Sequence, residues 1–374
     1  MRYRPYWVLL ILAGIFGCAG SNSSITSHPA APASTKHIYN GTASVGDFLN
    51  ITIDTSALTM SYTNVSNGQS GTVSYTVSAD GSYALNDPTG NLIAAYEVPG
   101  YALLIEATKA GPDKNTPALI TAVESGPISM STFANHSYNY MQFRTAAGGL
   151  EVGSVALSST SGQNSSYWPY GNLNPMQNSP FNSGTLDFSQ VVEDTSGTFM
   201  KSSAGSPGET DYIFGTASGF FIVDSSNGSI LGLPKASTKE FDPTTAGTYN
   251  AIFYQKTGAR TGVGNVETGT PALGKATITV STTGAVTVTD PQGKIVTQAT
   301  LTPVADASYL YGSAGELADP CNGMFTFRVK TAISQQDVFV TFVKNAVVFS
   351  TFSAALPWNA VNSTYDYQYG VGLK

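Results

Sequence analysis

Few residues in this chain are of types that could carry out catalysis. His136 could act as a general base, but no Gly-x-Ser-x-Gly elbow accompanies it. Glu193 and Asp194 are adjacent carboxylates, and neighbours on a strand point to opposite faces, so they cannot flank one glycosidic bond. Cys321 lies in a segment typical of a turn, without a visible His or Asn partner. The sequence therefore predicts no catalytic residue and no enzyme.

Residues that bind metals are equally scarce. The chain has 2 cysteines and 3 histidines, and they are too scattered to form a zinc site. Asp87–Asn91 places oxygen atoms at alternate positions, as the start of a calcium loop does, but it lacks the later Glu. The same segment is typical of a turn in which Asp and Asn make local hydrogen bonds. We therefore predict no metal site and no cofactor.

Aromatic residues in polar surroundings are the best candidates for ligand binding. Tyr167, Trp168 and Tyr170 lie in the amide-rich segment Ser158–Pro180, and Trp358 precedes the C-terminal strand. Aromatic faces beside amides and hydroxyls suit sugar rings, and Tyr and Trp are also common at the centres of protein interfaces. We predict that these four residues engage a glycan or a protein partner. The alternative is that Trp168 folds back over the end of a barrel.

The elements that would position these residues are strands. Ile51 and Ile53 alternate with polar residues, as strands with one buried face do. Asp80-Gly81 and Pro99-Gly100 each separate two such runs and predict hairpins. No stretch after the N-terminal segment has a sustained helical period, so crossover helices and parallel strands are not expected. The predicted fold class is all-β, with antiparallel meanders forming sandwiches or small barrels.

The strand pattern suggests three domains and a weak internal duplication. We place the domains at residues 38–127, 128–237 and 238–374, with the third a candidate repeat of the second. Ser137-Tyr138-Asn139 opens one copy and Thr248-Tyr249-Asn250 the other. The alternative is two unrelated segments with similar strands. Near the C-terminus, Tyr365, Tyr367 and Tyr369 share one face, which is either a binding face or the core face of a closing strand.

Composition excludes two classes of partner. Only 11% of the 374 residues are charged, the net charge is −7, and Lys and Arg are scattered singly. A nucleic-acid surface needs clustered cations, so we predict no nucleic-acid partner. Because Lys and Arg are not clustered, electrostatic attraction to anionic lipid headgroups is not expected either.

The first residues have the layout of a secretory signal. Arg2 and Arg4 precede the apolar run Trp7–Phe16, which Gly17 and Cys18 follow. This run is shorter than the roughly 20 residues that span a bilayer. The segment 1–18 resembles the signal peptide and lipobox of bacterial lipoproteins, although Phe16 stands where a small residue is usual.

The resemblance implies that residues 1–17 are removed and that the thiol of Cys18 carries the lipid anchor. Residues 18–37 are rich in Ser, Ala and Pro and predict a flexible tether. The alternative is an ordinary secretory signal with an incidental cysteine.

These observations predict a lipid-anchored binding protein of the cell envelope, at the outer membrane or the cell surface. It would bind a glycan or an envelope protein without catalysis. Two alternatives stay open, namely a structural or adhesive spacer and, with less support, a secreted hydrolase.

Overall fold

The structure is a computed structural model of the whole chain. It describes residues 36–110, 116–144, 150–159, 161–169, 182–187, 190–203, 209–226, 228–261, 264–267, 269–310, 319–356 and 363–374. The segment Thr35–Lys374 folds as one compact unit. The predicted signal peptide, Cys18 and the predicted tether up to residue 35 lie outside the described residues.

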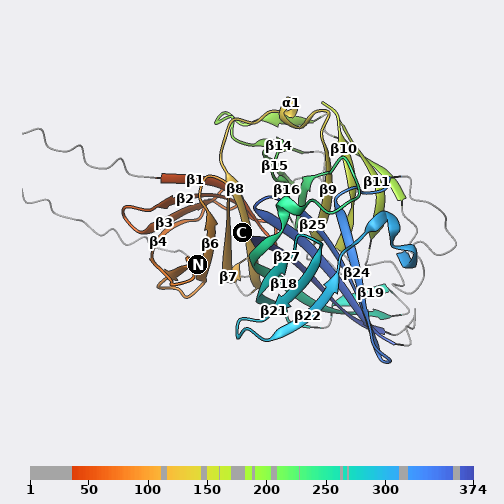
Figure 1. Cartoon of the computed structure of the whole chain (residues 1–374). Coiled ribbons are helices and arrows are strands. Elements are labelled where there is room, and N and C mark those ends of the chain that lie inside the picture. The colour runs from red at the N-terminus through yellow and green to blue at the C-terminus, as the bar shows by residue number, and fades with distance from the viewer. Residues whose placement is uncertain are drawn as a thin grey trace, which may run out of the picture. The chain divides into compact units, whose positions relative to one another are not determined.

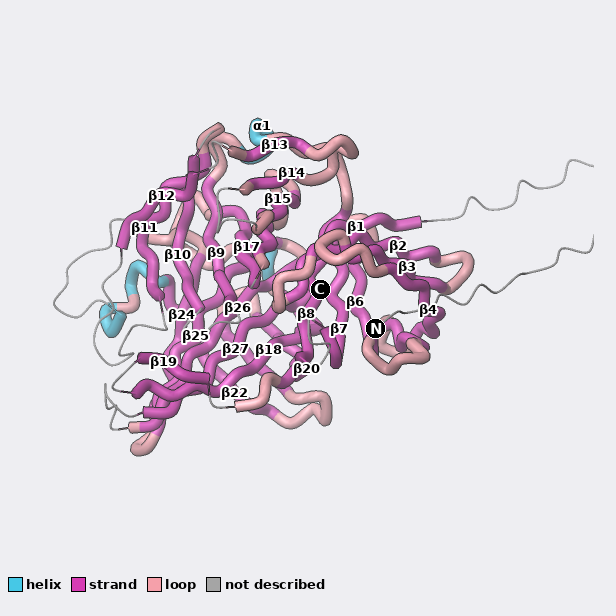
Figure 2. Tube along the Cα trace, turned by 180° about the vertical axis from the view of Figure 1, so that it is seen from behind, coloured by secondary structure: helices cyan, strands magenta, loops and turns pink. Residues whose placement is uncertain are grey.

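The fold is all-β and antiparallel, as the sequence predicts. The strands form a closed barrel, a 9-stranded sheet and a 10-stranded sheet (Figures 1 and 2). In the described part of the chain, the helical elements are short. They are α1 (Met130–Phe133), η2 (Pro243–Thr245), η3 (Val304–Asp306) and η4 (Ser308–Leu310). Within the same part, no helix is long and apolar enough to span a bilayer.

The barrel is formed by the first eight strands, and it closes because β1 pairs with both β2 and β8. Its strands are β1 (Lys36–Ala43), β2 (Phe48–Asp54), β3 (Thr59–Asn64), β4 (Ser70–Val77), β5 (Tyr83–Asn86), β6 (Leu92–Val98), β7 (Ala102–Ala110) and β8 (Thr116–Glu124). Ile51 and Ile53 are buried in its interior, in keeping with the alternation of β2. The predicted hairpins are present, with Gly81 and Gly100 at positive φ in the β4–β5 and β6–β7 turns.

The second sheet has the order β12-β11-β10-β9-β17-β16-β15-β14-β13. Its strands are β9 (Ser137–Arg144), β10 (Leu150–Leu157), β11 (Ser161–Pro169), β12 (Asn182–Asp187), β13 (Val191–Glu193), β14 (Met200–Ser202), β15 (Asp211–Gly215), β16 (Phe221–Ser225) and β17 (Gly228–Pro234).

The third sheet has the order β22-β21-β20-β18-β27-β26-β25-β24-β23, with β19 paired to β18. Its strands are β18 (Gly247–Thr261), β19 (Gly264–Glu267), β20 (Ala272–Val280), β21 (Ala285–Thr289), β22 (Ile295–Thr300), β23 (Thr302–Pro303), β24 (Met324–Lys330), β25 (Ser334–Val343), β26 (Ala346–Ala355) and β27 (Ser363–Leu373).

Apart from β19, the second and third sheets share one strand order. In each sheet the first strand pairs with the last, and the remaining strands extend from these two as meanders. The two Tyr-Asn segments that suggested a duplication begin β9 and β18, which hold equivalent places. Each predicted domain covers the strands of one sheet, except that β1 begins at Lys36, before the first predicted boundary, and the three sheets belong to one compact unit. The domain boundaries themselves stay a prediction.

Aromatic side chains join the three sheets. Phe48 of β2 stacks on Tyr212 of β15 with ring centroids 4.4 Å apart, and Phe143 of β9 stacks on Tyr369 of β27 at 5.5 Å. Tyr369 is buried, as are Tyr365 and Tyr367 on the same face of β27. The period-two tyrosines therefore form the core face of a closing strand, and they are not a binding face.

Candidate ligand-binding site

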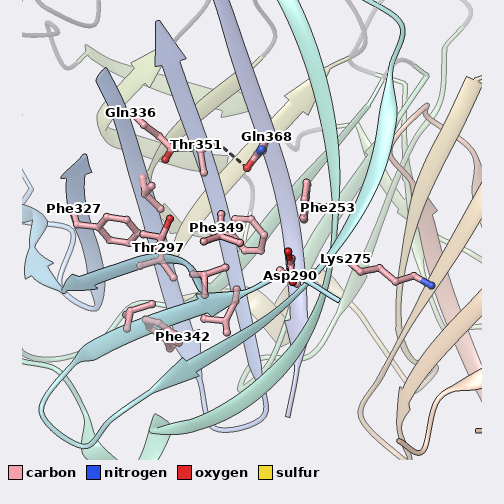
Figure 3. A pocket seen from close by; sticks show the side chains of 17 residues that line it. Phe253, Lys275, Asp290, Thr297, Phe327, Gln336, Phe342, Phe349, Thr351 and Gln368 are labelled. Carbon is pink, nitrogen blue, oxygen red and sulfur yellow. Dashed lines mark hydrogen bonds between the residues drawn. The ribbon is translucent and has the colours of Figure 1, made fainter. Parts of the chain in front are cut away.

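The third sheet curls around a cavity of about 220 Å³. β22 ends at Thr300 and β23 begins at Thr302, so the two edge strands lie together at one end of the sheet. No described pairing joins these edges further along, so the seam between them opens toward Ile295. The cavity lies along this seam, with Val296 and Thr297 of β22 among its lining residues (Figure 3).

The walls of this cavity are mainly apolar and come from both halves of the curled sheet. Three phenylalanines, Phe327, Phe342 and Phe349, face the cavity from β24, β25 and β26. The remaining large apolar side chains that line it are Phe253, Ile278, Val286, Val288, Val296, Val338 and Val340. A concave, largely apolar surface of this kind is typical of a small-molecule site.

Two glycines allow phenylalanine rings to lie flat across the wall. A Cβ atom at Gly274 would lie 2.2 Å from Cζ of Phe253. A Cβ atom at Gly370 would lie 2.3 Å from Cζ of Phe349 and 2.7 Å from Cβ of Phe253. All three distances are far below van der Waals contact, so the rings hold these positions only because the strands beneath them carry glycine.

A row of neutral polar side chains runs across neighbouring strands of the wall, and two of them, Thr351 and Gln368, line the cavity. Thr351 of β26, Gln368 of β27 and Gln255 of β18 occupy directly paired positions on three neighbouring strands. The hydroxyl of Thr351 donates to Oε1 of Gln368 at 3.3 Å (Figure 3). Nε2 of Gln368 donates in turn to Oε1 of Gln255 at 3.4 Å. Gln336 of β25 adds a further amide to the lining. These long bonds leave the amide groups able to bind a ligand's polar atom.

The charged groups at the margin of the cavity interact elsewhere. Nζ of Lys275 lies 2.6 Å from Oε2 of Glu106 in the barrel, and its side chain points away from the cavity (Figure 3). The carboxylate of Asp290 accepts hydrogen bonds from the backbone amides of Gln292 and Lys294 in its own turn. The cavity can therefore hold an uncharged molecule with a small polar group, and it offers no free charge to an ion.

An ion pair on the outer face of β24 and β25 supports the wall. The guanidinium of Arg328 donates two hydrogen bonds to the carboxylate of Asp337, at 2.5 and 2.9 Å, and lies over the ring of Tyr309. Burial raises the pKa of Asp337, although the bonds from Arg328 oppose this change. The bidentate geometry fixes the register of the two strands that carry Phe327, Gln336 and their neighbours.

The four predicted ligand-binding residues fall largely outside the described part of the chain. The backbones of Tyr167 and Trp168 lie in β11, but their side chains are outside the described residues. Tyr170 and Trp358 are outside them entirely. The prediction that these residues bind a glycan or a protein is therefore untested by the structure.

The structure places the other sequence candidates far from a common site. His136 is exposed in the turn before β9, and Glu193 is exposed in β13. Asp194 forms an ion pair with Lys201 at 2.7 Å. Cys321 is fully buried. None of these side chains shares an interaction with another that the structure describes.

In the turn that resembles a calcium loop, the carboxylate of Asp87 is hydrogen-bonded to the backbone of the turn itself. The carboxylate of Asp87 accepts hydrogen bonds from the backbone amides of Thr89, Asn91 and Leu92. This is the turn that the sequence offered as the alternative. Among the described residues, no group of three or more His, Cys, Asp or Glu is placed to hold a metal ion.

Sequence reasoning missed the residues of the cavity. A signal was present in β25, where Gln336 occupies the same face as Val338, Val340 and Phe342. A polar residue at the end of an apolar face indicates a place where the core opens. The lining comes from strands distant in sequence, so its assembly could not be read from the pattern.

Comparisons with known proteins add little. No protein-family model and no curated protein match this chain. Among solved structures, a transferrin binding protein B variant from Haemophilus parasuis Hp5 matches with a TM-score of 0.21 and 9% identity, covering 87% of this chain and 66% of that one. Intact Ap-TbpB with its N and C lobes gives 0.21 and 9%, covering 91% and 77%.

The isotype 1 transferrin binding protein B from serogroup B Neisseria meningitidis gives 0.20 and 10%, covering 88% and 66%. This chain thus spans slightly less than two thirds of the length of the first and the last of these structures. TM-scores this low say nothing about function.

Proposed function

We propose that this protein is a non-catalytic binding protein of the cell envelope, lipid-anchored through Cys18, that holds a small uncharged apolar molecule in the cavity of the third sheet. The observation that carries the ligand class is the lining of that cavity. Its walls are mainly apolar, its uncharged polar groups are amides and hydroxyls, and its marginal charges are engaged elsewhere. Burial of apolar ligand surface would supply the binding energy, at about 25 cal/mol per Å².

The position of the cavity supports reversible binding. Val296, at the seam, is 63% exposed, whereas Val338 on the opposite wall is 7% exposed. A ligand would enter past β22 and reach the buried side chains without separation of paired strands. Among the described residues, the edge strand β22 pairs with β21 alone, so it can move more easily than a strand that is paired on both sides.

Binding of N-phenyl-1-naphthylamine, an uncharged apolar fluorophore, tests the proposal. We expect saturable binding to the wild type, with displacement by n-octanol. Val296→Trp narrows the entrance from an exposed position, and Val338→Phe fills the interior. Each variant should raise the Kd at least tenfold.

Val192→Trp is the matched control, because Val192 is 61% exposed in β13, outside the third sheet. Its Kd should equal that of the wild type. The unfolding midpoint of every variant verifies folding. Unchanged affinity in both folded cavity variants would reject this site.

The proposed lipid anchor and the predicted partner of the aromatic residues need separate tests. Cys18→Ala should abolish labelling by a radioactive fatty acid and release the protein from membranes. For the glycan or protein partner predicted at Tyr167, Trp168, Tyr170 and Trp358, Trp168→Ala should weaken binding to a panel of polysaccharides or envelope extracts. An absence of binding by the wild type would remove that partner and leave the cavity ligand unaffected.

A further inference from the structure

The closed barrel contains a second cavity of about 220 Å³, which is independent of the one in the third sheet. It lies at the end of the barrel where β1 ends and β6 begins, and residues of both strands line it. An eight-stranded barrel has room in its interior for one small ligand. The inner wall is apolar and includes Leu49, Ile51 and Ile105.

The opposite end of this barrel is closed by a polar cluster. The carboxylate of Glu97 in β6, whose side chain is 1% exposed, accepts hydrogen bonds from the hydroxyls of Tyr39 and Tyr83. The ring of Tyr75 stacks on Tyr83 with centroids 4.4 Å apart. In the part of the chain that the structure describes, the barrel is therefore a cup that this cluster closes at one end, with the cavity at the other.

The rim of the cup is rich in groups that both donate and accept hydrogen bonds. Asn67 and Gln69 come from the β3–β4 turn, and Thr89 and Asn91 come from the β5–β6 turn. Asp47 from the β1–β2 turn adds a carboxylate. Amide and hydroxyl groups match the hydroxyls of a polyol, each of which also donates and accepts.

The electrostatic field at the rim disfavours an anionic head group. Although burial raises the pKa of Asp87, its hydrogen bonds with the turn lower that pKa overall, so the carboxylate remains charged beside Thr89. Its charge, together with burial, raises the pKa of the rim residue Tyr62. Among the lining residues that the structure describes, none is basic. An uncharged, hydroxyl-rich head above an alkyl chain is the chemistry that fits both parts of the cup.

We propose that the barrel binds a single-chain amphiphile, with its alkyl chain in the apolar interior and an uncharged polyhydroxylated head between the rim turns. The apolar side chains inside exclude water from the chain, and the amides outside replace the water around the hydroxyls. Neither half of such a ligand should bind well alone.

Isothermal titration with four probes tests this proposal. The probes are n-octyl-β-D-glucoside below its micellar concentration, n-octanol, sodium octanoate and glucose. We expect the glucoside to bind the barrel at least tenfold more tightly than octanol or octanoate, and glucose to show no binding. Equal affinity for octanoate would overturn the choice of head group.

Substitutions in the barrel test whether the glucoside binds in its cavity. Leu92→Trp, at a half-buried lining position, should reduce glucoside affinity at least tenfold, whereas Ile38→Trp, at a 52% exposed position of the same barrel, should not. Gln69→Ala with Asn91→Ala should bring glucoside affinity down to that of octanol. These two side chains serve as rim groups, so the fold should persist, and the unfolding midpoint checks this.

Val296→Trp separates this site from the cavity of the third sheet. It should leave glucoside binding unchanged. Loss of glucoside binding in Val296→Trp, with retention in Leu92→Trp, would place the ligand in the third sheet and overturn the proposal for the barrel.

Discussion

Nδ1 of His37 lies 2.7 Å from Oε1 of the buried Glu97. The sequence placed His37 at the end of a flexible tether, but the structure places it in β1, which begins at Lys36. The imidazole therefore completes the hydrogen-bonded cluster that closes one end of the barrel. The pairing register of β1 with β2, in which His37 lies opposite Ile53, decides this, because a shift of one residue would turn His37 to the outer face.

Glu97→Ala should strongly destabilise the barrel. The substitution leaves the buried hydroxyls of Tyr39 and Tyr83 without their carboxylate acceptor. A buried polar group that loses its partner costs about 1–3 kcal/mol, so the free energy of unfolding should fall by at least that amount. Urea unfolding followed by circular dichroism measures it. A change within about 0.5 kcal/mol, as is usual for a surface substitution, would contradict a structural role for the cluster.

Asp224→Asn should change the pH dependence of stability. Burial raises the pKa of Asp224 well above its usual value, although the hydrogen bond from Thr42 opposes the shift and the charges of Asp47 and Asp211 add to it. From about pH 4 upward, the unfolded chain releases this proton while the folded protein keeps it, so rising pH destabilises the wild type.

The Asn side chain cannot titrate and still accepts the bond from Thr42. We therefore expect the variant to gain stability relative to the wild type as the pH rises from about 4 to 7. Unfolding midpoints of the variant and the wild type, measured across this pH range, test this expectation. A difference between the two midpoints that stays constant with pH would contradict the raised pKa of Asp224.

Lys201→Met should raise the pKa of Asp194. The hydrogen bond from Lys201 is the largest cause that lowers this pKa to about 2, and the backbone amide of Ser196 adds to it. Because the folded pKa is depressed, the stabilisation is present above about pH 4 and is lost as the pH falls toward 2. Titration of the carboxyl carbon by NMR should show a clear upward shift in the variant. Titration at an unchanged pKa would mean that the ion pair does not persist in solution.

Gly370→Ala should destabilise the third sheet. The added Cβ would lie 2.3 Å from Phe349, so the ring must leave its position on the cavity wall. Overpacking of this kind costs about 1–3 kcal/mol. Gly126→Ala is the matched control, because a Cβ there meets nothing within 4 Å.

Gly370→Ala combined with Phe349→Leu should recover part of the lost stability, since the smaller side chain relieves the contact. Thermal unfolding of the single and double variants measures this coupling. Strictly additive effects would show that the glycine and the ring do not depend on each other.

Local features of the fold were predictable from the sequence. Alternation located β2, Asp80-Gly81 marked the β4–β5 turn, and the tyrosines of β27 shared a face. These features depend on neighbours in sequence, because side-chain direction and turn conformation are set over a few residues.

Features that depend on distant pairing were not predictable. Closure of the barrel requires Tyr39 of β1 to pair with Glu124 of β8, and alternation does not specify the partner of a strand. The cavity in the third sheet brings Phe253 near Phe349 by the same kind of pairing. The sequence thus left open whether the sheets form sandwiches or barrels, and it did not locate either cavity.

Pairing of the first strand with the last has a consequence for folding kinetics. In the barrel and in both sheets, the strand that begins the unit is bonded to the strand that ends it, and Asn250 pairs with Leu373 near the C-terminus. Pairings so distant in sequence slow folding, since a long loop must close before the interactions between the two strands can form. The third sheet can acquire its central pair of strands only after β27 has been synthesised, and until then β18 lacks its partner on one side.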